Sequence, residues 1–308
     1  MMQFRILGPV GIWSGAAEVP LSGTKQRTML AALLLAGGRV IPDYRLSQAL
    51  WGSEPPSTHQ AQLYTYASRL RQHLEEHAEI VRKGSGYLMR ITAGRFDYGD
   101  FTVLCRAGRD ALSSRRYDDA ADNLRAALSL WRGPTLTDVT DHLGETERPI
   151  IEESYMEALE GRILADLALG RHDQLASELI GLVQAHPLRE TLRAQLMVVL
   201  YASNRQAEAF AVYHEGRRRL EEELGVDPGS ALRRTYEAIL AGGIDQSWYA
   251  QLIGVPTQRA ERRGGAPLTA MAIRTPIMTP SAAGPFAHPW HEEAPADRGP
   301  LSRNVIVR

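Results

Sequence analysis

The 308-residue sequence lacks several features that whole classes of protein require. It has one cysteine, Cys105, so neither an internal disulfide nor a zinc site made of cysteines can form. Its longest apolar run, MLAALLLAGG at 29–38, is about half the length of a membrane-spanning helix, and its N-terminus has no charged region leading into an apolar one. We therefore expect a cytoplasmic protein without a membrane segment, in which Cys105 is a small buried apolar residue.

Signals of enzymatic chemistry are also missing. The two lysines of the sequence, Lys25 and Lys83, do not follow glycine as a phosphate-binding G-x-x-x-x-G-K-[ST] loop requires. GSGY at 84–87 is typical of a turn rather than of a dinucleotide-binding fingerprint, and the nucleophile motif G-x-S-x-G does not occur. We expect neither an enzyme nor a bound cofactor.

The net charge of −1 hides an uneven distribution along the chain. Residues 1–95 contain 11 basic and 6 acidic side chains, a net charge of +5, whereas residues 96–243 contain 17 and 25, a net charge of −8. Residues 244–308 carry a net charge of +2. A basic segment can bind a polyanion that an acidic segment repels, so the two main segments are predicted to have different partners.

Residues 1–95 have the order of elements of an OmpR-type winged helix-turn-helix, an α+β domain. The opening stretch QFRILGPVGIW is predicted as an extended strand, because its large apolar residues fall on one face. Asp43 is predicted to cap the second helix, and Ser57 with Gln60 has the spacing of a capping box for the third. Helices are predicted over 23–38, 43–52 and 57–77, and two β-segments about a Gly-Ser-Gly turn over 80–91.

Residues 96–243 are predicted to form an all-helical, tetratricopeptide-like domain, which makes the protein multidomain and mainly α. Three stretches are weakly similar to one another: RRYDDAADNLRAALSLW from 115, GRHDQLASELIGLVQ from 170 and NRQAEAFAVYHEGRRRL from 204. Arg171 and Arg205 lie 34 residues apart, the period of tetratricopeptide helix pairs. Residues 244–308 hold 8 of the 17 prolines and show no helical stripe, so this tail is expected to be disordered.

The third predicted helix separates its residues into two faces when each residue turns by about 100°. Leu63, Ala67, Leu70 and Leu74 form an apolar stripe that should be buried. The polar face lies nearly opposite this stripe and contains Thr58, Gln62, Thr65, Arg69 and Gln72, with Tyr66 and His73 flanking it. Such a face is typical of a helix that enters the DNA major groove. For one helix taken alone a merely solvated surface is the commoner explanation, but this helix lies between a helix pair and a basic hairpin in a segment with a net charge of +5, which favours DNA binding.

The side chains of this helix and of the following hairpin are candidate DNA contacts with different roles. Gln62 and Arg69 can bond to base edges, and the methyl group of Thr65 can meet thymine. Arg71, which leaves the helix on its other side, and the helix start at Thr58 are better placed for phosphates. The residues of the hairpin that could follow the backbone or enter the minor groove are Arg82, Lys83 and Ser85.

His73, Glu76 and His77 spell H-x-x-E-H, the order of one class of zinc peptidase. A zinc site needs both histidines on one exposed face together with a third ligand. On the helical wheel His77 lies about 40° from the apolar stripe, and the sequence identifies no third ligand. We therefore predict no metal site.

Several motifs resemble those of the SARP family, the Streptomyces antibiotic regulatory proteins of AfsR, DnrI and RedD type. The N-terminal motifs are GTKQRTMLAALLLAGGRVI, LSQALWGSEPP, YASRLRQHLE and RKGSGYLMRI, which resemble the family's winged-helix domain. ALSLWRGPTLTDV and the long stretch from AHPLRETLRAQL to LRRTYEAIL resemble the family's bacterial transcriptional activation domain. The resemblance covers about residues 3–241.

This resemblance implies a transcriptional activator of a secondary-metabolite gene cluster, such as one for an antibiotic. It would be a nucleoid-associated protein that binds direct repeats near promoters as side-by-side protomers and contacts RNA polymerase. Arg69 matches the family's base-contacting arginine and Arg71 a backbone-contacting one. Thr65 and Tyr66 match positions that face the groove, and Lys83 and Ser85 match the wing. Ala61 departs from the family, whose helices often carry a polar or basic residue there.

Two other functions stay open at this point. The helical domain could dominate, so that the protein is an interaction scaffold whose winged helix contacts proteins. The histidine-bearing helix could instead belong to a small metalloenzyme. Salt-dependent binding to promoter DNA distinguishes the transcriptional activator from both of these alternatives.

Overall fold

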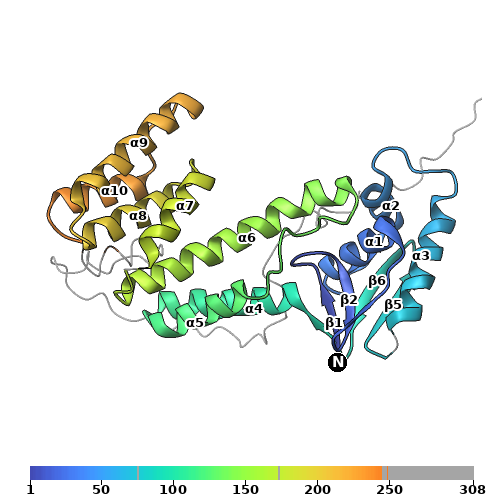
Figure 1. The fold of residues 1–308 in the computed structure, drawn as a ribbon. Coiled ribbons are helices and arrows are strands. Elements are labelled where there is room, and N and C mark those ends of the chain that lie inside the picture. The colour runs from blue at the N-terminus through green and yellow to red at the C-terminus, as the bar shows by residue number, and fades with distance from the viewer. Residues whose placement is uncertain (75, 173, 245–247, 249–308) are drawn as a thin grey trace, which may run out of the picture. The chain divides into compact units, whose positions relative to one another are not determined.

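The N-terminal region contains two small sheets and three helices in the computed structural model, which describes residues 1–74, 76–172, 174–244 and 248 (Figure 1). The first sheet has the strand order β3-β2-β1-β7, and the second has the order β4-β6-β5. Strands of the first sheet are β1 (Met2–Arg5), β2 (Gly11–Ser14), β3 (Ala17–Val19) and β7 (Arg95–Phe96). Those of the second are β4 (Ile41–Pro42), β5 (Ala78–Lys83) and β6 (Gly86–Ile91).

The stretch predicted as one extended strand is in fact two. β1 and β2 pair antiparallel, with Phe4 opposite Ile12, so the chain reverses between Arg5 and Gly11. Gly8 has a φ of +145°, a backbone conformation that residues other than glycine rarely adopt. Phe4 and Ile12 are both fully buried, so the predicted shared face is present although the strand is broken.

Three helices complete the winged helix-turn-helix: α1 (Gly23–Leu35), α2 (Asp43–Trp51) and α3 (His59–Leu74). Gly52 follows α2 with a φ of +66° and ends it as expected. Asp43, however, is the first residue of α2 and not its cap, because Pro42 holds the N-cap position and no side chain bonds there. The N–H of Asp43 instead donates to the carbonyl of Ser85, at 2.8 Å.

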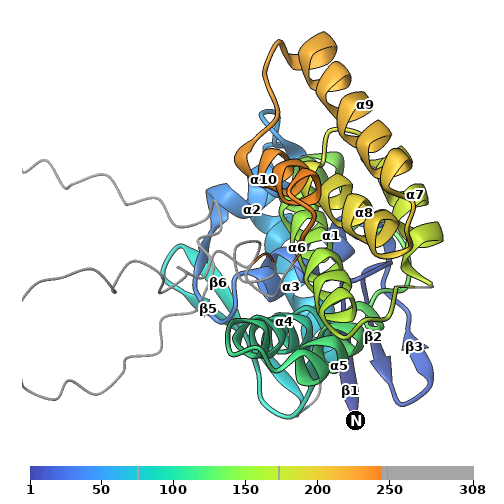
Figure 2. The same ribbon diagram turned by 90° about the vertical axis from the view of Figure 1, so that its left-hand side faces the viewer.

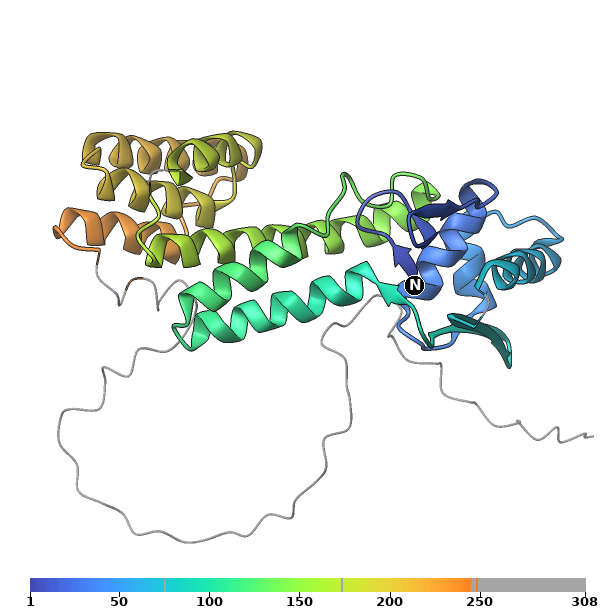
Figure 3. The ribbon, with the colours of Figure 1, turned by 60° about the horizontal axis from the view of Figure 1, so that its bottom comes forward.

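The rest of the described chain is helical, as predicted. The helices are α4 (Asp97–Ser113), α5 (Tyr117–Leu128), α6 (Asp141–Ala168), α7 (Leu175–Ala185), α8 (Glu190–Ala202), α9 (Gln206–Leu224) and α10 (Ser230–Leu240). α4, α5 and α6 pack lengthwise against one another, and α8 packs against α7, α9 and α10 (Figures 2 and 3). No helix in the described ranges is both long and apolar enough to cross a membrane.

A recurring turn explains the weak internal similarity of this region. Arg115, Gly170 and Asn204 each follow a helix and have φ angles of +58°, +75° and +58°. The next residue is an arginine in each case, and its N–H bonds to a carbonyl five residues earlier: Arg116 to Ala111, Arg171 to Asp166 and Arg205 to Leu200, at 2.8–2.9 Å. This is the Schellman pattern of a helix C-terminus, so the repeated sequence motif marks a repeated helix-to-helix turn.

The segment between α5 and α6 fastens the helical region to the winged helix-turn-helix. The N–H of Arg132 donates to the carbonyl of Leu7 at 2.9 Å, and Asp138 accepts from the N–H of Val10 at 2.9 Å and from Arg27 at 2.8 Å. The Arg132 guanidinium also pairs with the buried carboxylate of Asp97. α3 and the β5–β6 hairpin remain outside this junction.

Candidate nucleic-acid interface

The faces of α3 are divided as the helical wheel predicts. Leu63, Ala67, Leu70 and Leu74 are at most 1% exposed, which confirms the apolar stripe. The predicted polar face is accessible, since Thr58, Thr65, Arg69 and Gln72 are exposed and Gln62 is half-buried. The helix begins at His59, two residues later than predicted, because the carbonyl of Pro56 accepts the His59 N–H in a preceding turn.

Hydrogen bonds along α3 hold three of the predicted contact residues in place. The Gln62 amide donates to the Thr58 hydroxyl at 3.0 Å, and the Thr65 hydroxyl donates to the carbonyl of Ala61 at 2.9 Å. Arg69 differs from them, because no other residue in the described part of the chain forms an ion pair or hydrogen bond with its side chain. A free guanidinium on an exposed helix face has all five donors available for a ligand.

Tyr66 lies between the surface and the core. It is half-buried, its ring centroid is 6.5 Å from that of Trp51 on α2, and its hydroxyl lies 3.5 Å from Gln62. The Lys25 ammonium sits 4.8 Å from the centroid of the same Trp51 ring. Tyr66 therefore helps to set the angle between α2 and α3 and touches the polar face only with its hydroxyl edge.

Arg71 joins α3 to the wing, the β5–β6 hairpin of residues 78–91. Its Nε donates to the carbonyl of Ile80 at 2.8 Å, and its side chain is half-buried. Because Nε is engaged, only the terminal nitrogens can contact another group. The arginine predicted to contact phosphate is thus also a structural link between the helix and the hairpin.

The tip of the wing is exposed, but α2 holds the residue next to it, Arg82. Lys83 and Ser85 are exposed on either side of Gly84, which has a φ of +57°. Arg82 makes a bidentate ion pair with Asp43, with both N–O distances 2.6 Å, and stacks 4.6 Å from the Tyr87 ring centroid. Hydrogen bonding to Asp43 raises the pKa of the Arg82 guanidinium. The charge of Arg82 is therefore already neutralised, unlike that of Arg69.

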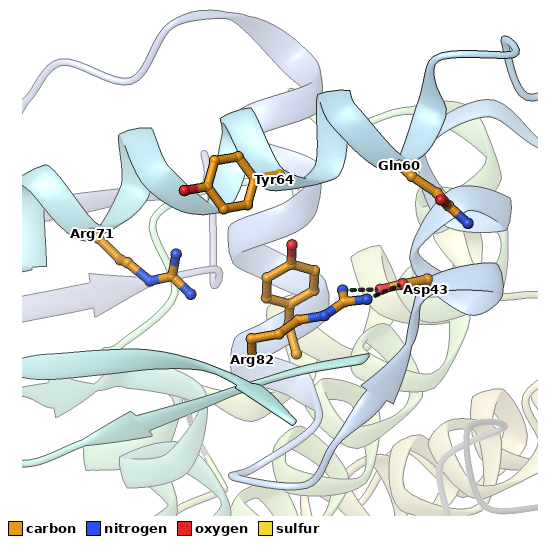
Figure 4. A pocket seen from close by; sticks show the side chains of 6 residues that line it. Asp43, Gln60, Tyr64, Arg71 and Arg82 are labelled. Carbon is orange, nitrogen blue, oxygen red and sulfur yellow. Dashed lines mark hydrogen bonds and ion pairs between the residues drawn. The ribbon is translucent and has the colours of Figure 1, made fainter. Parts of the chain in front are cut away.

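A depression of about 250 Å³ lies between α3 and the wing (Figure 4). Its lining comes from α2, α3 and both strands of the wing: Asp43, Gln60, Tyr64, Arg71, Arg82 and Tyr87. Tyr64, on the α3 side of the depression, is 65% exposed, and the side chain of Arg71 extends into the depression from the same helix. We call this depression the α3–wing groove.

The sequence did not single out Gln60, Tyr64 or Asp43 as members of the site. A signal was nevertheless present, because Gln60, Tyr64 and Arg71 fall within about 40° of one another on a wheel of about 100° per residue. These three residues form a third face of α3, beside the apolar stripe and the polar face, and only Arg71 was predicted to contact DNA from it. The contribution of Asp43 depends on the wing folding back onto α2, which no local pattern specifies.

The residues of the H-x-x-E-H sequence do not share one helix face. α3 ends at Leu74, so His77 lies in the following turn and shares no helix face with His73. The backbone of His77 supports the wing instead, because its carbonyl accepts the N–H groups of Thr92 and Ala93 at 2.9 and 3.1 Å. Within the residues that the structure describes, no group of three or more potential ligands could hold a metal ion.

Cys105 is buried on α4, 3% exposed, as expected. Burial raises the pKa of its thiol to about 12, so the thiol stays protonated and unreactive at neutral pH.

Both halves of the chain match known families. Residues 17–89 match the family described as "Transcriptional regulatory protein, C terminal", and residues 96–240 match "Bacterial transcriptional activator domain". Regulatory protein AfsR of Streptomyces coelicolor is 42% identical over 240 residues, which are 78% of this chain and 24% of AfsR. The chain therefore spans about a quarter of the length of that relative.

A second relative matches along nearly its whole length. Regulatory protein DnrI of Streptomyces peucetius is 34% identical, and the match covers 80% of this chain and 95% of DnrI. Among solved structures, Mycobacterium tuberculosis EmbR in complex with a low-affinity phosphopeptide is similar, with a TM-score of 0.76 and 32% identity. That similarity covers 82% of this chain and 69% of the EmbR chain.

Proposed function

Because this chain belongs to the SARP family of transcriptional regulators, we propose that it is a sequence-specific DNA-binding activator of a secondary-metabolite gene cluster, such as one for an antibiotic. The observation that carries the DNA-binding part is the guanidinium of Arg69, which lies on the exposed polar face of α3 and has no partner among the residues that the structure describes. It lies in a segment with a net charge of +5, beside a wing that presents Lys83. If the protein were only an interaction scaffold, our second hypothesis, the exposed Arg69 and the neighbouring Lys83 would have no function.

The proposed contacts divide by role. α3 enters the major groove, where Arg69 and Gln62 read base edges and Thr65 supplies an apolar contact, with the Tyr66 hydroxyl at the margin. The start of α3 at Thr58 and the terminal nitrogens of Arg71 contact phosphates, which fix register without reading sequence. Lys83 and Ser85 at the wing tip meet the neighbouring backbone or minor groove. Arg82, the remaining predicted contact, could join them only by giving up or sharing its ion pair with Asp43.

The proposed partners of the two regions differ as their charges do. The basic winged helix-turn-helix binds promoter direct repeats, with neighbouring protomers side by side on one face of the DNA. The helical region, whose net charge is −8, is repelled by the duplex and is left for contacts with RNA polymerase or another protomer. A protein with these partners works in the cytoplasm, at the nucleoid.

The variant Arg69→Ala should lose about 1–3 kcal/mol of binding free energy for its promoter and discriminate less among bases at one position. Lys83→Ala should weaken all sequences about equally and reduce the salt dependence, because it removes a phosphate contact. Mobility shift of promoter and random duplexes over a series of salt concentrations measures both effects. Arg106→Ala, an exposed arginine on α4, is the matched control and should bind as wild type does. Equal affinity and selectivity of Arg69→Ala and wild type would show that the base-contact assignment is wrong.

A further inference from the structure

Asp43, the first residue of α2, contacts the wing through both its backbone and its side chain, directly after the pairing of β4 with β6. Its N–H donates to the carbonyl of Ser85 at 2.8 Å, and its carboxylate takes both terminal nitrogens of Arg82 at 2.6 Å. Asp43 and Arg82 are 39 residues apart along the chain. The Asp43 side chain is 15% exposed and that of Arg82 is 45% exposed, so the pair sits at the surface of the α3–wing groove (Figure 4).

The groove contains two guanidinium groups but only one of them carries an uncompensated charge. Arg71 uses its Nε for the carbonyl of Ile80, a neutral group, whereas Arg82 faces a carboxylate. The formal charge of the groove is therefore +1 and not +2. If α3 lies in the DNA major groove and the wing tip meets the neighbouring DNA backbone, the DNA strand between these two contacts passes over the α3–wing groove.

We propose that Asp43 restrains DNA binding by holding Arg82 in an ion pair and so withholding one positive charge from the phosphodiester that crosses the α3–wing groove. In this arrangement the terminal nitrogens of Arg71 and the exposed Tyr64 hydroxyl meet the phosphate, while the Asp43 carboxylate repels it. The backbone bond from Asp43 to Ser85 keeps the wing in place independently of that charge. The inference rests on the proposed function, since it concerns how tightly the same site holds DNA.

The test is the neutral substitution Asp43→Asn, which keeps the side-chain shape and the backbone N–H. It should bind both promoter and random duplex more tightly than wild type, by about three- to tenfold near 0.1 M salt, with the slope of log K against log salt steeper by about 0.9 for one more phosphate contact. Adding Arg82→Gln to this variant should return the slope to the wild-type value. Asp43→Ser, a second neutral substitution, should act like Asp43→Asn and serves if that variant folds poorly.

Glu79→Gln is the matched control, because it also removes one negative charge and does so within the wing itself, on β5. Glu79 pairs with Arg90 at 3.4 Å, opposite it in the β5–β6 register and away from the Lys83–Gly86 tip. This variant should keep the wild-type slope. If Asp43→Asn binds less tightly, or with an unchanged slope, Asp43 only positions the wing and the proposal is overturned. If wild type binds promoter and random duplex equally or not at all, it is the proposed function that fails.

Discussion

Replacing Asp97 with alanine should lower the free energy of unfolding by about 3–5 kcal/mol, the usual cost of breaking a buried ion pair from one side. Asp97 is 7% exposed and accepts from three backbone N–H groups: those of Ile6, Leu7 and Tyr98, at 2.8–3.1 Å. Arg132 completes the set from the segment between α5 and α6. Alanine would leave the three backbone N–H groups without their acceptor in a buried place and would also unpair Arg132, whose side chain is 34% exposed.

Urea unfolding of the variant measures this loss, with Asp100→Ala as its control. Asp100 lies one turn further along α4 and pairs with Arg95 at 2.8 Å, but both side chains are more exposed, at 34% and 54%. An ion pair of that kind contributes about 0–1 kcal/mol, so the control should unfold nearly as wild type does. Equal destabilisation by the two substitutions would mean that the junction between the winged helix-turn-helix and the helical region is not held by Asp97.

Burial also affects the protonation of this carboxylate. Desolvation raises the pKa of Asp97 above its usual value, against the opposing effects of the backbone N–H groups and of Arg132. The backbone N–H groups and Arg132 therefore stabilise the charged form, which burial alone disfavours. This is the reason why removing the acceptor should cost much more than removing an exposed one.

What could be predicted from the sequence followed from local patterns. The stripe of Leu63, Ala67, Leu70 and Leu74 specified which way α3 faces, and hence that Arg69 is exposed, because one helix repeats every 3.6 residues. The order of helices and β-segments specified the winged helix-turn-helix. Even the weak similarity of the helical region had a local cause, the left-handed turn residue at the end of three helices.

The features that escaped prediction are pairs of residues far apart in the chain. Asp97 bonds to groups 91 residues before it and 35 residues after it, and Asp43 to Arg82 across 39 residues. Local propensity predicted Asp43 as a helix cap, but in the folded protein its carboxylate pairs with Arg82 of the wing. Capping is a competition that tertiary structure decides, so the sequence could place Arg82 on the wing but could not show that its charge is neutralised.

Trp248→Ala should be as destabilising as Asp97→Ala, although it lies in the segment predicted to be a disordered tail. Trp248 is 4% exposed within the apolar core that α6 to α10 share, and its indole N–H donates to the Thr235 hydroxyl on α10 at 3.0 Å. Residue 248 is therefore part of the folded helical region, while residues 245–247 and 249–308 lie outside the described part of the chain. The prediction of a disordered tail rested on the proline-rich composition of residues 244–308 as a whole, and it therefore overlooked this single aromatic side chain.

Truncating a buried tryptophan to alanine costs about 3–5 kcal/mol through lost burial and the cavity that remains. Trp248→Phe is the matched control, because it keeps an aromatic ring and removes the donor to Thr235, for about 1 kcal/mol. A chain that ends at Gly243 should unfold as easily as Trp248→Ala or more so, since it lacks the same ring. Its DNA affinity at a temperature where it is folded should nevertheless match that of the full chain, because α3 and the wing lie outside that core. Wild-type stability of the truncated chain, measured by urea unfolding, would show that Trp248 contributes nothing to the core.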